Sequence, residues 1–329
     1  MNKTKTPLIS IGMPVFNGAE YIAGAIESII NQSINDFELV ICDNASTDDT
    51  EIICRKFAAE DARIHYYRNE KNIGAHPNYN RTFDLTSGRY FKWAPHDDLL
   101  HSDFLECCIS AMEERPESVV SQSYLQYIDA DDNKIGIYDS KLTGSNSSSP
   151  VRRFASLLLT KHPSYEIMGV FRRSALVGTK LLQSFHGSDR ALLAELALRG
   201  TFNQIQEPLQ LVRDHKERYS RAQVRPRDRA HWHDARLNSR FSFPTWKLYG
   251  EYLTMVGRNI PSFSDKVGCY LVLIAWWGTN WNAVRMLVDV IAVLLPDATR
   301  YAEKVKQALF SPAPGADEVG PTNSKSSQK

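Results

Sequence analysis

The segment FKWAPHDDLL, residues 91–100, joins an aromatic, apolar run to two adjacent carboxylates. Tyr90 to Trp93 favour a strand, and Pro95 cannot continue a central ladder, so the chain leaves the sheet just before Asp97 and Asp98. Ligands of open α/β sheets bind at the carboxyl ends of the strands. Carboxylates there suit Mg²⁺ or Mn²⁺ carrying a diphosphate, because such ions are usually held by one or two carboxylates plus substrate phosphate. The alternative is an Asx turn that caps the next helix.

Apolar runs and helical patterns alternate over the first hundred residues. They predict strands at residues 8–13, 37–42, 64–67 and 90–94, separated by helices at 20–30, 50–59 and 78–85. This alternation predicts an α/β fold with a doubly wound, mostly parallel sheet. Because parallel strands end at the same edge, the four loops that follow them should meet in one ligand crevice.

The pattern is weaker beyond residue 100. We expect helices at 104–112 and 191–199, a longer strand at 119–128, two short strands at 202–205 and 209–212, and a charge-rich helix at 225–240. The Ser-rich residues 144–150 are typical of a lid or a flexible excursion.

Composition excludes several classes of protein. The formal net charge of +1 over 329 residues gives no reason to expect a nucleic-acid partner. Five cysteines without C-x-x-C spacing argue against a disulfide framework and a structural zinc site. Residues 1–7 lack the apolar core of a signal peptide, so the expected location is cytoplasmic.

Four short motifs at the predicted strand ends together resemble the nucleotide-diphospho-sugar glycosyltransferases of family 2, which have the GT-A fold. The resemblance covers roughly residues 8–215 and rests on Pro14-Val15-Phe16-Asn17, on DNASTD at residues 43–48, on Asn72-x-Gly74 and on Asp97-Asp98. A Rossmann dehydrogenase is disfavoured, since the first turn has no G-x-G-x-x-G.

The resemblance implies roles on the donor side. Pro14, Phe16 and Asn17 would border the base and ribose of a nucleotide-sugar donor, with Phe16 as an apolar face for the base. Asp43 would accept a hydrogen bond from the base, unless it only forms the Asx turn before the next helix.

Asn72 and Gly74 would shape the donor pocket, or simply form a turn.

The resemblance also implies a metal site. Asp97 and Asp98 would hold the divalent metal and the donor diphosphate, with the split between them open because Pro95 stands where the family often has a further Asp. His215 would ligate the metal or serve as a structural residue, and Arg213 would fork onto phosphate oxygens.

His96 is expected to point outward and is left out of the site.

Asp189 is the candidate general base. It follows Gly187-Ser188 at a helix start, where similar transferases carry their catalytic Asp, and a carboxylate there can take the acceptor hydroxyl proton. The alternative is that it only caps the helix. The resemblance implies an inverting transferase that adds a single sugar to a glycan or lipid-linked acceptor in surface polysaccharide synthesis, because Arg213 is not followed by the Trp of processive members.

Two other functions stay open. A metal-dependent nucleotidyltransferase would also need carboxylates, but residues 14–18 lack the basic residue usual in a triphosphate loop. A nucleotide-sugar-binding pseudoenzyme would lack a working Asp189.

We expect a catalytic domain over residues 1–220 (donor part about 8–100, acceptor part about 101–220), a helical region over 221–310 and a disordered tail over 311–329. The apolar segments 267–277 and 286–295 are shorter than the ~20 residues needed to cross a bilayer.

On a helix Asn282, Arg285 and Asp289 would form a narrow polar stripe beside a broad apolar face with nearby tryptophans. This face should pack on the catalytic domain or a homodimer partner, or insert shallowly at the cytoplasmic surface of a membrane as a peripheral contact.

Overall fold

The computed structural model describes residues 6–215 and 243–294, so the helix expected at 225–240 and the tail at 311–329 lie outside the described residues. Its first part alternates strands and helices as expected: β1 (Ile9–Val15), α1 (Ile22–Ile30), β2 (Phe37–Asp43), α2 (Thr50–Glu60), β3 (Ile64–Arg68), α3 (Ala75–Asp84) and β4 (Tyr90–Trp93). These four strands pair in parallel, in the order β3-β2-β1-β4. The predicted parallel α/β half is confirmed.

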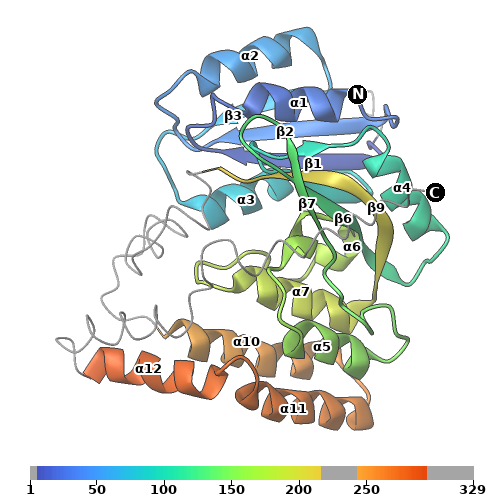
Figure 1. Cartoon of the computed structure of the whole chain (residues 1–329), viewed down its shortest axis with the longest axis vertical. Helices are drawn as coiled ribbons and strands as arrows, with labels where there is room; N and C mark the ends of the chain where they lie inside the picture. The colour runs from blue at the N-terminus through green and yellow to red at the C-terminus, as the bar shows by residue number, and fades with distance from the viewer. Residues whose placement is uncertain (1–5, 216–242, 295–329) are drawn as a thin grey trace, which may run out of the picture.

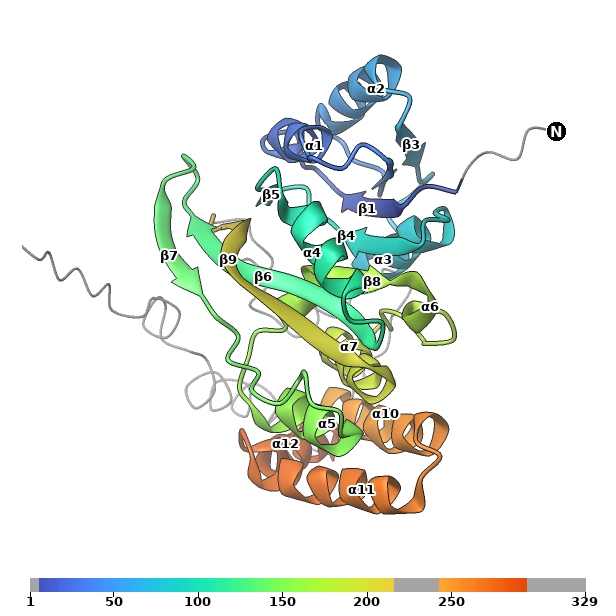
Figure 2. The same ribbon diagram turned by 90° about the vertical axis from the view of Figure 1, so that its right-hand side faces the viewer.

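Sequence pattern explains why this half folds as it does. Ile22, Ala25, Ile26 and Ile29 recur at helical spacing on α1 and are all buried. They join a core with the inward residues of β1, β2 and β4, so burial of one apolar stripe fixes the helix on the sheet. Helices α1 and α2 lie on one face of the sheet and α3 on the other (Figures 1 and 2).

The second part is of mixed direction. It contains β5 (Leu99–Leu100), α4 (Phe104–Glu113), β6 (Ser118–Ile128), β7 (Lys134–Tyr138), α5 (Pro150–Leu159), the 3-10 helix η1 (Tyr165–Met168), β8 (Val170–Arg172), α6 (Arg173–Leu176), α7 (Ser188–Arg199) and β9 (Thr201–Arg213). The described sheet continues from β4 as β8-β6-β9-β5, with β7 paired to β6. Strand β8 is antiparallel to both β4 and β6, whereas β6 and β9 run parallel.

The two short strands expected at 202–205 and 209–212 are one strand. β9 runs without a break from Thr201 to Arg213, and its register against β6 shifts between Ser123 and Leu125. Pro208 lies in the shifted part, where it interrupts the pattern that signals a strand without ending the pairing with β6.

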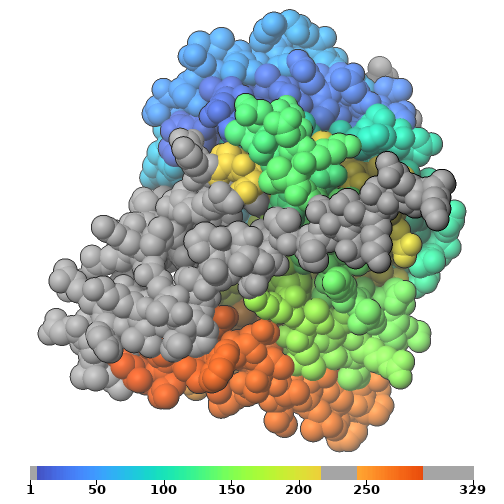
Figure 3. Space-filling model, in the orientation of Figure 1, coloured from blue at the N-terminus to red at the C-terminus, as the bar shows by residue number. Residues whose placement is uncertain are grey.

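Three C-terminal helices form one end of the molecule: α10 (Pro244–Asn259), α11 (Phe263–Gly278) and α12 (Asn282–Leu294) (Figures 1 and 3). Helix α10 packs on α7 and α11 packs on α5. Val256 and Leu273 of this layer belong to the same buried cluster as Phe154 and Leu193 of α5 and α7. Within the described residues, no helix is both long and apolar enough to span a membrane.

The polar stripe of α12 points into the protein. Asn282 and Asp289 are about 5% exposed or less, while Leu287 is 58% exposed. Asn282 donates a 2.9 Å hydrogen bond to the Trp276 carbonyl, and the Asp289 carboxylate accepts one of 3.0 Å from the Thr245 backbone at the start of α10. These polar groups satisfy the ends of neighbouring helices, so Val284 and Leu287 of α12 lie outward, while Met286 is buried in the core.

Candidate active site

The loops after β1 and β2 are bonded to each other. Asn17 adopts a left-handed φ of 53°, and its side-chain oxygen accepts a 2.8 Å hydrogen bond from the Thr47 backbone. Its own backbone N–H donates to the Ser46 hydroxyl at 2.9 Å. Pro14 is buried in β1 opposite Cys42, whereas Phe16 is 44% exposed at the rim. The arrangement leaves the Phe16 ring accessible beside a rigid double loop.

Asp43 ends β2 as a fully buried carboxylate. One oxygen accepts from the Ser46 backbone at 2.8 Å, and the other accepts from the Tyr66 hydroxyl and from Arg68 Nη1, both at 2.6 Å. Burial and this carboxylate raise the pKa of Tyr66. The Arg68 guanidinium supplies the countercharge that a buried carboxylate needs. The expected Asx turn is present, together with an ion pair that holds Asp43 at the sheet edge.

A group of amide side chains fixes the loop after β3. The Asn72 oxygen accepts from the Gly74 backbone at 2.8 Å and from Asn44 at 2.9 Å. Asn69 bridges the side chains of Asn44 and Asn78 with two bonds of 2.9 Å. Gly74 has a φ of +93°, which L side chains rarely adopt, and it precedes the first residue of α3. The predicted Asn72–Gly74 turn is therefore held from the end of β2.

The two carboxylates after β4 have different partners. Asp97 Oδ2 and His215 Nε2 are joined by a 2.9 Å hydrogen bond. Burial acts to raise the pKa of Asp97, but the bond to His215 and the charges of His96 and His215 outweigh it, so that this pKa lies below its ordinary value. Asp98 Oδ1 instead accepts a 3.0 Å bond from the Arg213 backbone N–H. The structure thus brings the ends of β4 and β9 together.

Arg213 is a buried residue whose side chain joins two loops. Its Nε donates to the Asp97 carbonyl at 3.0 Å, and its Nη1 donates to the carbonyls of Asp129 and Ala130 at 3.2 Å. Nη2 forms a 2.6 Å ion pair with Asp132. These bonds tie the β6–β7 turn to the loop after β4, and the phosphate contact expected for Arg213 stays a prediction.

His96 does not point away from the site. A Cβ added to Gly18 would lie 2.4 Å from His96 Cδ2, so the imidazole lies against the glycine that follows Asn17. The expectation that His96 points outward is wrong, because the missing side chain of Gly18 leaves room for the ring. Loops after β1 and β4 therefore touch, as the parallel arrangement requires.

The fit of a divalent cation can be judged from the donor set. Among the described residues there is no group of three or more His, Cys, Asp or Glu side chains placed to hold a metal. The Asp97 carboxylate and the His215 imidazole are adjacent and would fit an ion whose other ligands are the donor diphosphate and water. Asp98 turns toward the backbone of β9, so its place in the ligand set stays a prediction.

Asp189 is the second residue of α7. Gly187, with a φ of +90°, is the N-cap residue, and no side chain caps this helix end. The side chain of Asp189 is half-buried and forms no hydrogen bond or ion pair with any described residue. The structure shows no capping hydrogen bond from the Asp189 side chain among the described residues, and its catalytic role stays a prediction.

Helix α3 connects the loop after β3 to the start of α7. His76, two residues after Gly74, has its Nδ1 3.3 Å from the Ser188 hydroxyl and 2.5 Å from the Gln183 carbonyl. Asn80 exchanges two hydrogen bonds, of 2.8 and 3.1 Å, with the Leu182 backbone. The segment that leads into Asp189 is thus held on the helix that begins at the Asn72–Gly74 turn.

Sequence reasoning missed the residues that position these groups. Arg68 pairs directly with Asp43 across the parallel strands β2 and β3, so an Arg and an Asp at two consecutive strand ends were the available signal. His76 and Asn44 carried no comparable signal, because each acts through a contact about 30 or more residues away in the chain.

Comparison with known proteins agrees with this geometry. The profile described as glycosyl transferase family 2 matches residues 10–177, just over half of the 329-residue chain. The chain is 27% identical over 197 residues to a Campylobacter jejuni protein named GalNAc(5)-diNAcBac-PP-undecaprenol beta-1,3-glucosyltransferase, covering 60% of this chain and 62% of that protein. It spans less than two thirds of the length of the curated relatives it matches.

Solved structures give the same fold. S. aureus TarS 1-349 in complex with UDP-GlcNAc superposes with a TM-score of 0.60 at 13% identity, covering 92% of this chain and 76% of that one. The mannosyltransferase PcManGT from Pyrobaculum calidifontis, in complex with GDP-Man and Mn²⁺, gives a TM-score of 0.51 at 15% identity, covering 94% and 89%. With the four strand-end motifs in place, this chain belongs to glycosyltransferase family 2 and has the GT-A fold.

Proposed function

We propose that this chain is an inverting glycosyltransferase that moves a single sugar from a nucleotide-diphosphate sugar to a hydroxyl acceptor. The observation that carries the proposal is Asp189, a half-buried carboxylate with no described partner at the start of α7, held through Ser188 and His76 to the donor side. A sugar hydroxyl is a poor nucleophile, and a carboxylate within reach takes its proton as the new bond forms. Direct attack by that oxygen inverts the anomeric carbon.

The donor would lie over the loops after β1 to β4. Phe16 offers an exposed ring to the base, and the buried Asp43 carboxylate, bonded to Tyr66 and Arg68, would hold the sheet edge on which the base lies rather than bond a base N–H itself. A divalent ion, Mg²⁺ or Mn²⁺, held by Asp97 and His215 would offset negative charge on the leaving diphosphate. Donors of this kind, UDP-GlcNAc and GDP-Man, occupy the two structural neighbours.

The acceptor would be a glycan or a lipid-linked glycan of a surface polysaccharide. The C. jejuni relative is named for an undecaprenol-linked substrate, which is a membrane lipid. Phe263, Val267, Leu271 and Ile274 recur at helical spacing on α11, are all exposed, and form a face without a charged residue. We infer that this face contacts the cytoplasmic surface of the membrane that carries the acceptor.

A screen of nucleotide sugars tests the transferase. Thermal unfolding of the chain is followed with UDP-, GDP- and dTDP-sugars, each with and without Mn²⁺, since a ligand of the folded state raises the midpoint. The expected result is stabilisation by one nucleotide class that depends on Mn²⁺, followed by release of the nucleoside diphosphate when an acceptor extract is added.

Other outcomes identify the competing functions. Release of pyrophosphate from a nucleoside triphosphate would show a nucleotidyltransferase. Tight donor binding without turnover in the presence of acceptor would show a binding protein. No stabilisation by any nucleotide sugar would contradict the proposal.

A further inference from the structure

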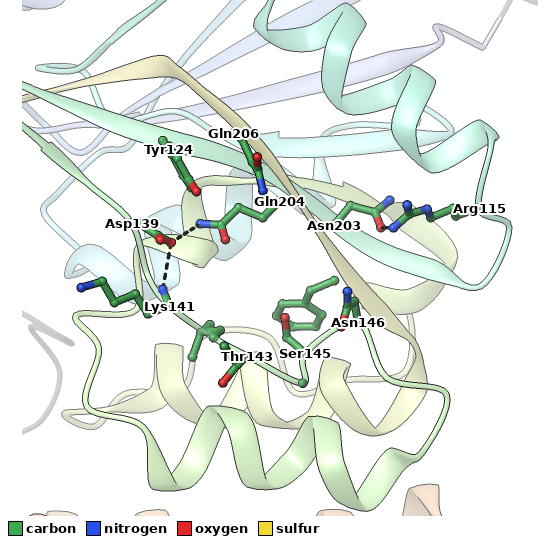
Figure 4. A pocket seen from close by; sticks show the side chains of 13 residues that line it. Arg115, Tyr124, Asp139, Lys141, Thr143, Ser145, Asn146, Asn203, Gln204 and Gln206 are labelled. Atoms are coloured by element: carbon green, nitrogen blue, oxygen red, sulfur yellow. Dashed lines mark hydrogen bonds between the residues drawn. The ribbon is translucent and has the colours of Figure 1, made fainter.

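A cavity of about 560 Å³ lies on the second part of the fold, β5 to β9, which we call the acceptor half, away from the loops after β1 to β4 that belong to the donor half (Figure 4). Its walls are the start of β9 and the chain between β7 and α5, with Tyr124 of β6 between them. Asp139 Oδ1 accepts a 3.1 Å hydrogen bond from Gln204 on the opposite wall, which joins the two walls, and one of 2.9 Å from the Lys141 backbone within its own wall. The volume falls within the range of small-molecule sites.

The chemistry of the lining suits a carbohydrate. Most of the polar side chains are uncharged amides and hydroxyls, among them Asn146 and Gln206 on opposite walls. Such groups both donate and accept hydrogen bonds, as sugar hydroxyls do. Buried Phe202 and Leu142 supply an apolar floor for the C–H face of a sugar ring. The charged lining residues, Arg115, Asp139 and Lys141, carry both signs, which does not favour a phosphate ligand.

The strands that line the cavity, β6 and β9, run on from it toward the candidate active site. Gln204, which lines it, also borders a small adjoining recess with Tyr138 and Tyr165. These two tyrosines contact each other edge to face at a centroid distance of 5.5 Å, and both contact Tyr127 near the end of β6 in the same way, at 6.4 and 6.1 Å. Aromatic rings of this kind present an apolar face and a hydroxyl at once.

The length of this path follows from the strand register. Gln122 of β6 lies opposite Gln204, and Ile128 lies opposite Arg213, whose backbone bonds Asp98. At about 3.3 Å per residue, the path from the cavity to the metal site is roughly 20 Å. A single sugar cannot span it, but a chain of several can.

We propose that this cavity binds sugar units of an oligosaccharide acceptor at a distance from its reactive hydroxyl. The proposal rests on the transferase function proposed above, and it narrows the acceptor to an oligosaccharide rather than a monosaccharide. The half-buried Tyr138 and Tyr165, between the cavity and the active site, would contact the intervening sugars. The Ser-rich chain at 144–150, expected to be a lid or an excursion, thereby contributes a wall of a binding site.

Binding by the full chain tests the proposal. The probe is an immobilised panel of bacterial surface oligosaccharides and their monosaccharide units, read against wild type, the double variant Asn146→Ala/Gln206→Ala and the control Glu207→Ala. Asn146 and Gln206 are exposed, so their truncation should leave the fold intact. Glu207 is equally exposed on β9 but does not line the cavity. The nucleotide-sugar screen is repeated on all three proteins.

We expect wild type and Glu207→Ala to retain particular oligosaccharides but no monosaccharide, and the double variant to bind them at least about tenfold more weakly, as loss of two hydrogen bonds implies. Equal binding by the double variant, or no oligosaccharide bound by a wild type that binds a donor, would overturn the proposal. Oligosaccharide binding that needs the cavity, in a protein without any donor affinity, would support the cavity and refute the transferase.

Discussion

The donor half and the acceptor half of the sheet are built by different means. In the donor half, β1 to β4 pair in parallel and each strand but the last is followed by a helix that packs on the sheet. In the acceptor half, the three-residue strand β8 inserts antiparallel between β4 and β6, and β9 returns alongside β6 from some 80 residues further along the chain. The donor half thus presents fixed loops, whereas the acceptor half brings distant segments to those loops.

This difference predicts a separation of roles. Residues at the ends of β1 to β4, together with His215 after β9, should govern donor binding, whereas Asp189 at the start of α7 should govern transfer. A variant in one half that changed both donor affinity and the rate of transfer would show that the two halves act as one binding unit. Donor affinity is therefore measured beside turnover or stability.

The largest effect is expected for Asp189→Asn. The amide keeps the size of the side chain but cannot take a proton, so transfer should fall by ~10²–10⁴ while donor affinity stays near that of wild type. Donor affinity is measured by calorimetry and transfer by release of nucleoside diphosphate. Asp265→Asn, which changes a first-turn Asp of α11, is the matched control. Near-normal turnover by Asp189→Asn would reject the general base.

Asp97→Asn should mainly lower donor affinity, whereas Asp189→Asn should mainly lower the rate of transfer. Loss of the charge that faces His215 should weaken Mn²⁺-dependent nucleotide affinity by about 10- to 100-fold, the range seen when metal-site partners are removed. Asp98→Asn tests the second carboxylate, which in this structure accepts from the Arg213 backbone.

The exposed Asp84 at the end of α3 provides the control Asp84→Asn. Unchanged Mn²⁺-dependent affinity in both the Asp97 and Asp98 variants would remove the metal role from this pair.

The donor half could be predicted from the sequence because its signals are local. Each of β1 to β4 is an apolar run followed by a polar turn, and parallel pairing alone then places Asn17, Asp43 and Asp97 at one edge. The positions of these side chains followed from topology without knowledge of any distant contact.

The acceptor half gave fewer signals. A strand as short as β8 has no periodicity to detect, and its place depends on pairing with both β4 and β6. His96 was misjudged because its neighbour, Gly18, lies on another strand end. The inward polar stripe of α12 likewise depends on the ends of α10 and α11, which helical spacing within α12 cannot reveal.

The exposed face of α11 gives a third, smaller effect. Leu271→Ser/Ile274→Ser removes apolar surface from residues that are 59% and 67% exposed, so binding to vesicles of anionic and zwitterionic phospholipid should fall by about tenfold or more. Donor affinity should not change, because this face lies at the far end from β1 to β4 (Figure 2).

Val177→Ser, at a residue that is 59% exposed beside α6, is the control. Light scattering on the same proteins separates the alternatives. A wild-type dimer that the double variant converts to a monomer, without vesicle binding by either, would show a protein contact in place of the membrane.

The last effect is on stability rather than on activity and concerns Lys92, where the two halves meet. Lys92 lies in β4 opposite Val170 of β8, is fully buried, and donates a hydrogen bond to the Met168 carbonyl. Burial lowers the pKa of Lys92 to about 8, although Cys108 and Asp98 act in the other direction. Below pH 8 the ammonium is charged in the folded and unfolded states, and the full cost of burying it is present.

The sign of the pH dependence follows from proton counts. Between pH 8 and about 10.4 the unfolded chain keeps the lysine proton that the folded protein has lost, so the contribution of Lys92 to stability rises with pH, by about 1.4 kcal/mol per unit.

Lys92→Met removes this pH-dependent contribution and adds a pH-independent cost of about 1–3 kcal/mol for the unpaired Met168 carbonyl. The difference in free energy of unfolding between variant and wild type should therefore favour Met most at pH 7 and shrink steadily from pH 8 to 9.5. Urea unfolding at four pH values measures it, with Lys134→Met on the exposed strand β7 as control. A difference that stays constant over this range would mean that the buried ammonium does not release its proton there, and that the junction between the halves holds a charge throughout.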